Sequence, residues 1–363
     1  MLATGVAVAL SLLCHIQASH AQRKKNEEPK SQVQPLPPEP PSALATETDT
    51  LDFHISSLLK TGGLAAQIRQ SLNDLIRDTK GETIVKLRAF VAGSGDARRV
   101  QALVTDLFTE HKLALPVLSI LQVGALGQES AQVVIEAVVS TRRTVNPNGL
   151  VFFFGQRASN FDKALRQLKE DTEAASVDAD HVLTCTCFTS HIDSYETLSS
   201  KIRALFAHVE FNVVQAVRDP VTEATTCQAI AQLTSAAADG PVVVMDFAHA
   251  TLVRSPQLIF TGMQLTFGNY LDDAHEAFSR LQRTAAALRP VETPVQVNAF
   301  AIDPYSASAL KKTVSLPSAT FTVQTIEGLP AIDATAGIEA VLAPNVEAAV
   351  VLKKRKSGDT ILR

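Results

Sequence analysis

The chain has 363 residues, of which 46% are apolar and 19% charged, a composition typical of a globular protein rather than a disordered one. Its formal net charge is −4, and it has no Trp and only three Tyr, so neither a nucleic-acid partner nor an aromatic stacking site is favoured. Four Cys are too few for a disulfide-dense scaffold, and no internal stretch is apolar enough to cross a membrane.

The first 21 residues have the pattern of an export signal. Residues 2–14 form an apolar run that is too short for a spanning helix, and Ser19-His20-Ala21 has the small-x-small pattern of a cleavage site. We expect cleavage after Ala21 and export to the periplasm or the medium, although no Lys or Arg precedes the apolar run. The alternative is a buried N-terminal helix. Residues 22–50 contain six prolines and mixed charges and are expected to form an extended linker.

The rest of the chain repeats one order of elements three times: strand, amphipathic helix, strand, helix and two closing strands. In the first segment, residues 51–142, we expect a hairpin at 51–59, helices at 65–75 and 98–108, and strands at 84–91, 118–123 and 132–139. In the second, residues 143–236, we expect strands at 149–156, 182–188, 211–217 and 225–231, and helices at 161–168 and 195–206. In the third, residues 237–345, we expect strands at 257–264, 295–302, 320–324 and 337–342, and helices at 274–281 and 306–313. Residues 346–363 are expected to form a last strand, 348–352, and a basic tail.

Several landmark residues keep the same order and similar spacing in the three segments. Gln228 follows Glu136 by 92 residues, and Glu339 follows Gln228 by 111 residues. A glycine, a leucine and a glutamine recur at similar intervals, with small insertions in the third segment. This common register indicates an internal repeat.

Short stretches within these segments resemble the RidA/YjgF family of reactive intermediate deaminases. LIFTGMQ at 258–264 resembles the family's LVFTSGQ strand, and AQIRQSL at 66–72 resembles its AQTRQAL helix. VKLRAFVA at 85–92 resembles VKTTVFLAD, and the sequences at 134–138 and 337–343 resemble the closing IEAIA strand. The resemblance covers residues 51–343. It implies an α+β fold in which three RidA-like (chorismate-mutase-like) repeats form an intramolecular pseudo-trimer, and thus a monomer with clefts between its repeats.

The resemblance also assigns candidate site residues. In the family, an Arg holds the substrate carboxylate and a Glu orients the water that hydrolyses 2-imino or enamino acids to 2-oxo acids and ammonia. The positions of that Arg are taken here by Leu118, Phe211 and Thr320, and those of the Glu by Glu136, Gln228 and Glu339. No segment therefore keeps both residues, and Leu or Phe cannot make the bidentate pair that a guanidinium makes with a carboxylate.

We expect an exported, catalytically degraded RidA-like protein that binds a small metabolite or a partner. Glu136 and Glu339 are the candidate acids, and Leu118, Phe211, Thr320 and Gln228 are the candidate binding positions. One alternative is an active 2-imino or enamino acid deaminase, in which Arg88 or Arg218 replaces the lost Arg. The other is a purely structural module. No cofactor, metal or nucleic-acid partner is expected.

The cysteines leave two alternatives open. Cys185 and Cys187 alternate on a predicted strand and share one face, and Cys227 lies on a closing strand that should neighbour it. Buried free thiols are the expected state, and a Cys185–Cys227 or Cys187–Cys227 disulfide is the alternative in an exported protein. His181 and His191 lack the spacing of zinc ligands, and no partner acid is visible for His249 or His275.

Overall fold

The computed structural model describes residues 37–93, 95–220, 222–235, 240–268, 270–288, 292–314, 320–344 and 351–353. The chain divides into two units, Met1–Pro37 and Pro38–Arg363, and the sheets and helices belong to the second. The predicted signal peptide, most of the predicted linker and the basic tail lie outside the described residues. Within the described part of the chain, the helices are too short or too polar to cross a membrane.

The first sheet has four strands in the order β2-β6-β3-β4. They are β2 (Leu51–Ile55), β6 (Val133–Ser140), β3 (Thr83–Ala92) and β4 (Val117–Val123). β3 and β4 are parallel, and the other two pairs are antiparallel. Helices α1 (Leu64–Asp78) and α2 (Arg98–Glu110) cover one face with apolar residues at helical spacing, such as Ile68, Leu72, Val104 and Leu107.

The second sheet has eight strands in the order β18-β11-β12-β7-β10-β8-β9-β5. Its members are β5 (Ala125–Leu126), β7 (Leu150–Phe153), β8 (Val182–Thr189), β9 (Glu210–Gln215), β10 (Thr225–Gln232), β11 (Val242–Met245), β12 (Ala250–Val253) and β18 (Val351–Lys353). Helices α3 (Phe161–Ala174) and α4 (Tyr195–Leu205) pack against this sheet. The side chains of Asn160 and Ser194, which precede them, cap the helix N-termini. The 3-10 turns η2 (Ala179–His181) and η3 (Asp246–Ala248) connect its elements.

The third sheet has six strands, with the path β1-β13-β17-β15-β16 and β14 paired to β17. They are β1 (Ala43–Glu47), β13 (Gln257–Thr261), β14 (Gln264–Thr266), β15 (Glu292–Ala301), β16 (Phe321–Thr325) and β17 (Ala336–Pro344). The turn η1 (Thr48–Thr50) leads from β1 into the first sheet. Helices α5 (Tyr270–Ala286) and α6 (Pro304–Thr313) pack on the outer face.

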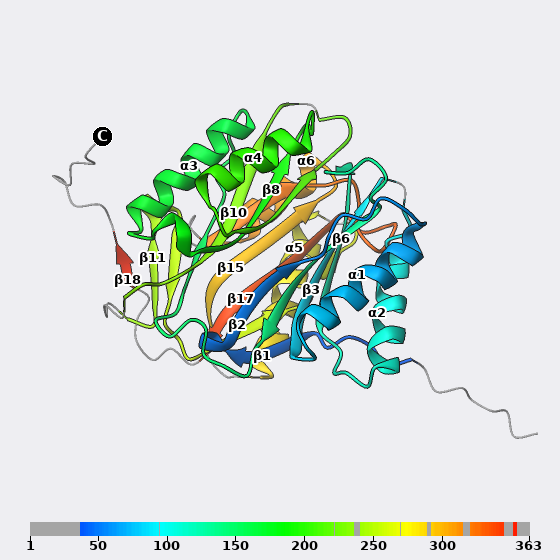
Figure 1. Cartoon of the computed structure of the whole chain (residues 1–363), viewed down its shortest axis with the longest axis horizontal. Coiled ribbons are helices and arrows are strands. Elements are labelled where there is room, and N and C mark those ends of the chain that lie inside the picture. Colours follow the sequence, from blue (N-terminus) through cyan, green and yellow to red (C-terminus); the bar gives the residue numbers. More distant parts are fainter. Residues whose placement is uncertain are drawn as a thin grey trace, which may run out of the picture. The chain divides into compact units, whose positions relative to one another are not determined.

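The inner faces of the three sheets share one apolar core. Phe53 from the first sheet, Phe152 from the second and Phe260 from the third belong to the same buried cluster. The helices α1 to α4 lie on the outer sides of the strands in Figure 1. Each of the three phenylalanines removes enough apolar surface from water to contribute about 1.5–3 kcal/mol. The inner strand faces are therefore buried against one another, and polar side chains among them need polar partners.

The predicted fold class, an α+β pseudo-trimer of RidA-like repeats, is wrong. The structure is a mixed α/β arrangement of sheets with four, eight and six strands, and these sheets cross the predicted segment boundaries. β5 leaves the first segment for the second sheet, β11 and β12 leave the third segment for the second sheet, and β1, predicted as linker, joins the third. Each of these short strands pairs with a neighbouring strand whose backbone N–H and C=O groups would otherwise be unpaired at the edge of a sheet. The predicted hairpin at 51–59 is instead the single strand β2.

A disulfide joins β8 to β10. Cys187 and Cys227 lie directly opposite each other in the antiparallel pair, with their Cα atoms 4.1 Å apart. The expectation of free thiols is therefore wrong for these two residues and holds for Cys185. Burial raises the pKa of the Cys185 thiol to about 12, so it stays protonated although its Sγ lies 3.9 Å from that of Cys187.

Reduction of the Cys187–Cys227 bond is expected to lower the free energy of unfolding by about 4 kcal/mol, because the bond closes a loop with a sequence separation of 40. Chemical denaturation with and without a phosphine reductant measures the difference. The double variant Cys187→Ala/Cys227→Ala should not respond to the reductant, and Cys185→Ala should respond like the wild type. Equal stability of the oxidised and reduced wild type would contradict this prediction.

Candidate functional site

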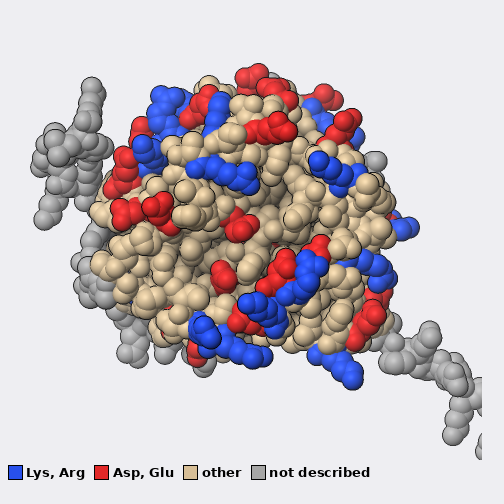
Figure 2. Space-filling model, viewed as in Figure 1, with Lys and Arg blue, Asp and Glu red and all other residues tan. Residues whose placement is uncertain are grey.

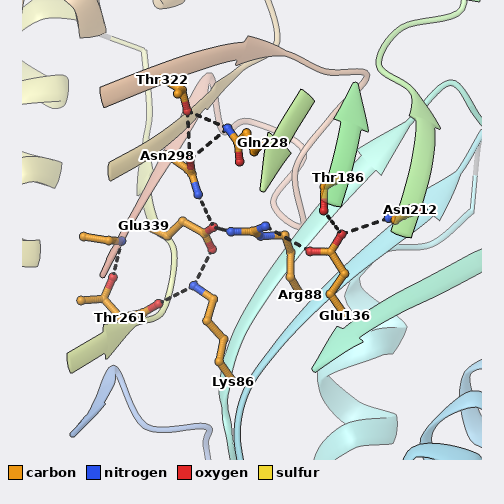
Figure 3. Close-up of polar contacts among 11 residues, drawn as sticks. Lys86, Arg88, Glu136, Thr186, Asn212, Gln228, Thr261, Asn298, Thr322 and Glu339 are labelled. Carbon is orange, nitrogen blue, oxygen red and sulfur yellow. Dashed lines mark hydrogen bonds and ion pairs between the residues drawn. The ribbon is translucent and has the colours of Figure 1, made fainter. Parts of the chain in front are cut away.

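Two cations and two carboxylates meet in the interior, where the three sheets come together (Figure 3). Lys86 and Arg88 alternate along β3 and therefore share its inner face. The Nζ atom of Lys86 lies 2.7 Å from Oε2 of Glu339 on β17, and Nη1 of Arg88 lies 3.1 Å from Oε2 of Glu136 on β6. Arg88 Nη2 also donates to Oε1 of Glu339. Lys86 and Arg88 thus join the first sheet to the third through their ion pairs with Glu339.

Glu136 extends the network to the second sheet. Its Oε1 atom accepts hydrogen bonds from Thr186 Oγ1 at 2.7 Å and from Asn212 Nδ2 at 3.2 Å. Thr186 lies on β8 and Asn212 on the parallel strand β9. Both oxygens of this carboxylate are therefore engaged by side chains of the described residues.

Gln228 closes the network between the second and third sheets. Its Nε2 donates to Asn298 Oδ1 at 3.2 Å and to Thr322 Oγ1 at 3.0 Å, and Asn298 Nδ2 donates to Glu339 Oε1 at 3.3 Å. In each sheet the participants are opposite one another in the antiparallel register: Arg88 with Glu136, Thr186 with Gln228, and Asn298 with Glu339. Every pair of sheets is thus joined by a polar contact at the same level.

Glu339 is a buried, ionised carboxylate. Its side chain is 1% exposed. Burial opposes ionisation, but the adjacent Arg88 and Lys86 outweigh it and lower the pKa of the carboxyl well below its usual range. The two positive and two negative charges balance, which a buried cluster requires. A carboxylate with a lowered pKa and occupied oxygens is a poor general base.

The structure brings together three of the candidate residues and separates the others. Glu136, Gln228 and Glu339 belong to the network described above. Leu118 and Phe211 line two separate clefts. Thr320 is buried beside β16.

The two arginines considered as substitutes are engaged elsewhere. Arg88 forms ion pairs with Glu136 and Glu339. Nη2 of Arg218 lies 3.4 Å from Oε2 of Glu327. The expectation that His249 has no partner acid is wrong, because its Nδ1 lies 3.0 Å from Asp171 Oδ1. Among the described residues, no group of three or more His, Cys, Asp or Glu is placed to hold a metal ion.

The cleft beside Phe211 has a volume of about 310 Å³, and its wall includes the cationic side chain of Arg203. We call it the Arg203 cleft; it is lined by Ile55, Ser56, Ser57, Leu58, Val134, Tyr195, Arg203, Val209, Glu210, Phe211 and Asn212. The guanidinium carbon of Arg203 lies 4.9 Å from the centroid of the Phe211 ring. Arg203 makes no ion pair with any carboxylate in the described part of the chain.

The cleft beside Leu118 is smaller and is bordered by the N-terminal segment. Its volume is about 190 Å³, and Glu39, Pro40 and Pro41 contribute to its wall. The carbonyl oxygen of Ser42 accepts a hydrogen bond of 2.8 Å from the Gly262 N–H, which holds this segment in place. The lining residues of this cleft include no Lys, Arg or His.

Lys86 and Arg203 are not among the site residues predicted from the sequence. Lys86 carries a recognisable signal, since two cations at alternate positions of an otherwise apolar strand must either break the core or pair within it. Arg203 lies at an exposed turn of an amphipathic helix, where an arginine is ordinary, and only the position of Phe211 gives it significance.

Comparisons with known proteins give only distant similarity. No family model and no curated protein match the chain. Among solved structures, it is similar to a cyanuric acid hydrolase, with 13% identity, a TM-score of 0.23, and coverage of 82% of this chain and 100% of the other. The cyanuric acid hydrolase from A. caulinodans has 12% identity, a TM-score of 0.22 and coverages of 83% and 99%. PurLQS from Thermotoga maritima has 12% identity, a TM-score of 0.28 and coverages of 85% and 76%.

None of these structures is named as a RidA protein, so they give the RidA-like description of the chain no support. The correction of the fold class follows from the sheet order described above. The similarities are too distant to carry an argument about activity.

The variant Glu339→Gln is expected to lose about 3–5 kcal/mol of stability at neutral pH, because it leaves Lys86 without an anionic partner and Arg88 with Glu136 alone. Since the pKa of Glu339 is lower in the folded chain than the unfolded value of about 4.3, its stabilisation is present above that pH and is lost as the pH falls through the folded pKa. The variant should lack this acid-dependent loss. Urea denaturation from neutral to acidic pH measures both effects.

Glu129→Gln, at an exposed position, is the matched control and should behave like the wild type. A Glu339→Gln variant as stable as this control would show that the buried pair contributes nothing.

Proposed function

We propose that this protein binds a small organic carboxylate in the Arg203 cleft and does not hydrolyse it. The observation that carries this proposal is the guanidinium of Arg203, which lies over the Phe211 ring, without an ion-pair partner among the described residues, in a cleft of about 310 Å³. A cation–π contact uses none of the N–H groups of a guanidinium as hydrogen-bond donors to a polar partner. These N–H groups match the geometry of a carboxylate in a bidentate pair.

Neighbouring side chains support a polar ligand. Ser57 and Tyr195 bring hydroxyl groups to the lining of the cleft. Burial raises the pKa of Tyr195, so its hydroxyl is protonated at neutral pH and is able to donate. A Cβ atom at Gly127 would lie 2.0 Å from the Tyr195 ring, so the absence of a side chain there allows the ring its position.

The engagement of the candidate acids supports binding rather than deamination. Glu339 is buried with both oxygens occupied, and Glu136 accepts from Arg88, Thr186 and Asn212. A base that activates water needs a free oxygen facing the substrate. We therefore assign both residues to structure and the ligand to the cleft.

We also propose that the protein acts after export, as a monomer, and without a nucleic-acid partner. The N-terminal apolar run with its small-x-small site supports export, and so does the Cys187–Cys227 disulfide, because such bonds persist in oxidising compartments. The net charge of −4 argues against a nucleic-acid partner.

Arg203→Gln is expected to weaken binding of 2-oxobutanoate by about 10- to 100-fold, because one charge-assisted interaction is lost. Isothermal titration calorimetry measures the affinity, and 2-oxobutanamide, which lacks the negative charge, should bind weakly to both proteins. Arg166→Gln, at an exposed position on α3, is the matched control and should bind like the wild type.

Failure of 2-oxobutanoate to bind the wild type, or equal binding by Arg203→Gln, would refute the proposed site. Release of ammonia from freshly generated 2-iminobutanoate should equal that of buffer alone. Faster release that disappears in Glu136→Gln would establish the deaminase instead.

Expression of the full chain in a bacterium with a secretion pathway should yield a mature protein that begins at Gln22, because the signal pattern ends at Ala21. N-terminal sequencing of the cell-envelope and cytoplasmic fractions measures this. Protein found only in the cytoplasm with residues 1–21 intact would contradict export.

A further inference from the structure

A second cavity lies at the centre of the inner sheet faces and is separate from the Arg203 cleft. Its volume is about 70 Å³, and its walls include Phe53, Phe152 and Phe260, one from each sheet. A water molecule needs roughly 10–15 Å³ of cavity volume on this measure. The cavity therefore has room for about five water molecules, or for one small organic molecule of the same total volume. We call it the central cavity.

Solvent reaches this cavity. Arg88 and Glu136, which line it, are 15% and 14% exposed. The face drawn in Figure 2 is hollowed over β10, β15, β17 and β2. These four strands come from all three sheets, and each contributes residues to the cavity wall. A small solute therefore has a route to the lining side chains.

Two polar side chains in the wall have no hydrogen-bond partner in the described part of the chain. They are the carboxamide of Gln296, which is 5% exposed, and the hydroxyl of Thr184. Together they offer at least two donors and two acceptors. An unpaired buried polar group is costly, so a ligand that satisfies these groups gains affinity.

The charges around the cavity balance, which argues against a charged ligand. Lys86 and Arg88 are paired with Glu339 and Glu136, and His54 at the wall lies 3.2 Å from Asp52. Neither a cation nor an anion would find an uncompensated opposite charge there, and either would pay to leave water. The three Phe rings favour a planar body.

We infer that the central cavity binds a small, uncharged, planar molecule of the amide class, whose carbonyl oxygen and amide N–H groups face Gln296 and Thr184. This site is independent of the carboxylate site proposed above, because it shares no arginine with the Arg203 cleft. Acetamide, acetate and acetamidinium test it, since they have nearly the same shape and carry charges of zero, −1 and +1.

Titration of the wild-type chain is followed by the methyl resonances of its isoleucines, of which Ile230 lines the cavity. Acetamide at millimolar concentration should shift the Ile230 signal in a saturable way, since so small a molecule offers few contacts and binds weakly. Acetate and acetamidinium should shift it far less at equal ionic strength. The variant Ile230→Val assigns the signal.

Gln296→Leu and Thr184→Val should each weaken the acetamide response by about five- to tenfold, the loss of one neutral hydrogen bond. Thr109→Val, at an exposed position on α2, is the matched control and should respond like the wild type. No saturable shift with acetamide would mean that the cavity holds water only. Equal shifts from the three probes, or a stronger shift from acetate, would also overturn the inference. This outcome does not depend on whether the Arg203 cleft binds 2-oxobutanoate.

Discussion

The structure depends on placing two buried cations opposite two buried carboxylates. Lys86 and Arg88 lie on one strand of the first sheet, Glu136 on its neighbour, and Glu339 on the third sheet. The inner sheet faces are otherwise largely apolar, so each of these charges would be expensive without its partner. The requirement also specifies register: a slip of one residue in β3 would turn Arg88 toward α1 and α2 and leave Glu136 and Glu339 unpaired.

This constraint separates structural polar groups from those available for a ligand. Glu136, Glu339 and Gln228 have partners in the network, and their hydrogen bonds join all three sheets. Arg203 and the side chains of Gln296 and Thr184 in the central cavity have no such role. The interior acids thus stabilise the arrangement that creates the two cavities, and the ligand-binding capacity lies in the groups the network leaves unused.

Much of the local structure follows from the sequence. The helices at Leu64–Asp78 and Phe161–Ala174 appear as predicted, because apolar residues at helical spacing mark the face that packs on a sheet. The common register of Glu136, Gln228 and Glu339 also has a physical counterpart, since these three residues face the same interior network.

The assembly of the sheets could not be predicted in the same way. The short strands β5, β11 and β12 have little periodicity of their own and are defined by the edges they complete. The motifs that resembled RidA are local, and they do not specify which sheet such a strand joins. The pairing of Lys86 with Glu339 spans 253 residues, and no local pattern reveals it. Arg203 is recognised as a candidate binding residue only from its position over the Phe211 ring, which the sequence does not reveal.

A double-mutant cycle on the buried pair tests the central claim most directly. Lys86→Met and Glu339→Leu are each predicted to lower the free energy of unfolding by about 3–5 kcal/mol, because each leaves a buried charge uncompensated. The double variant is predicted to be at least as stable as either single variant, since neither of those two charges remains. Additive losses in the double variant, or single losses no larger than those of an exposed ion pair, would contradict the account.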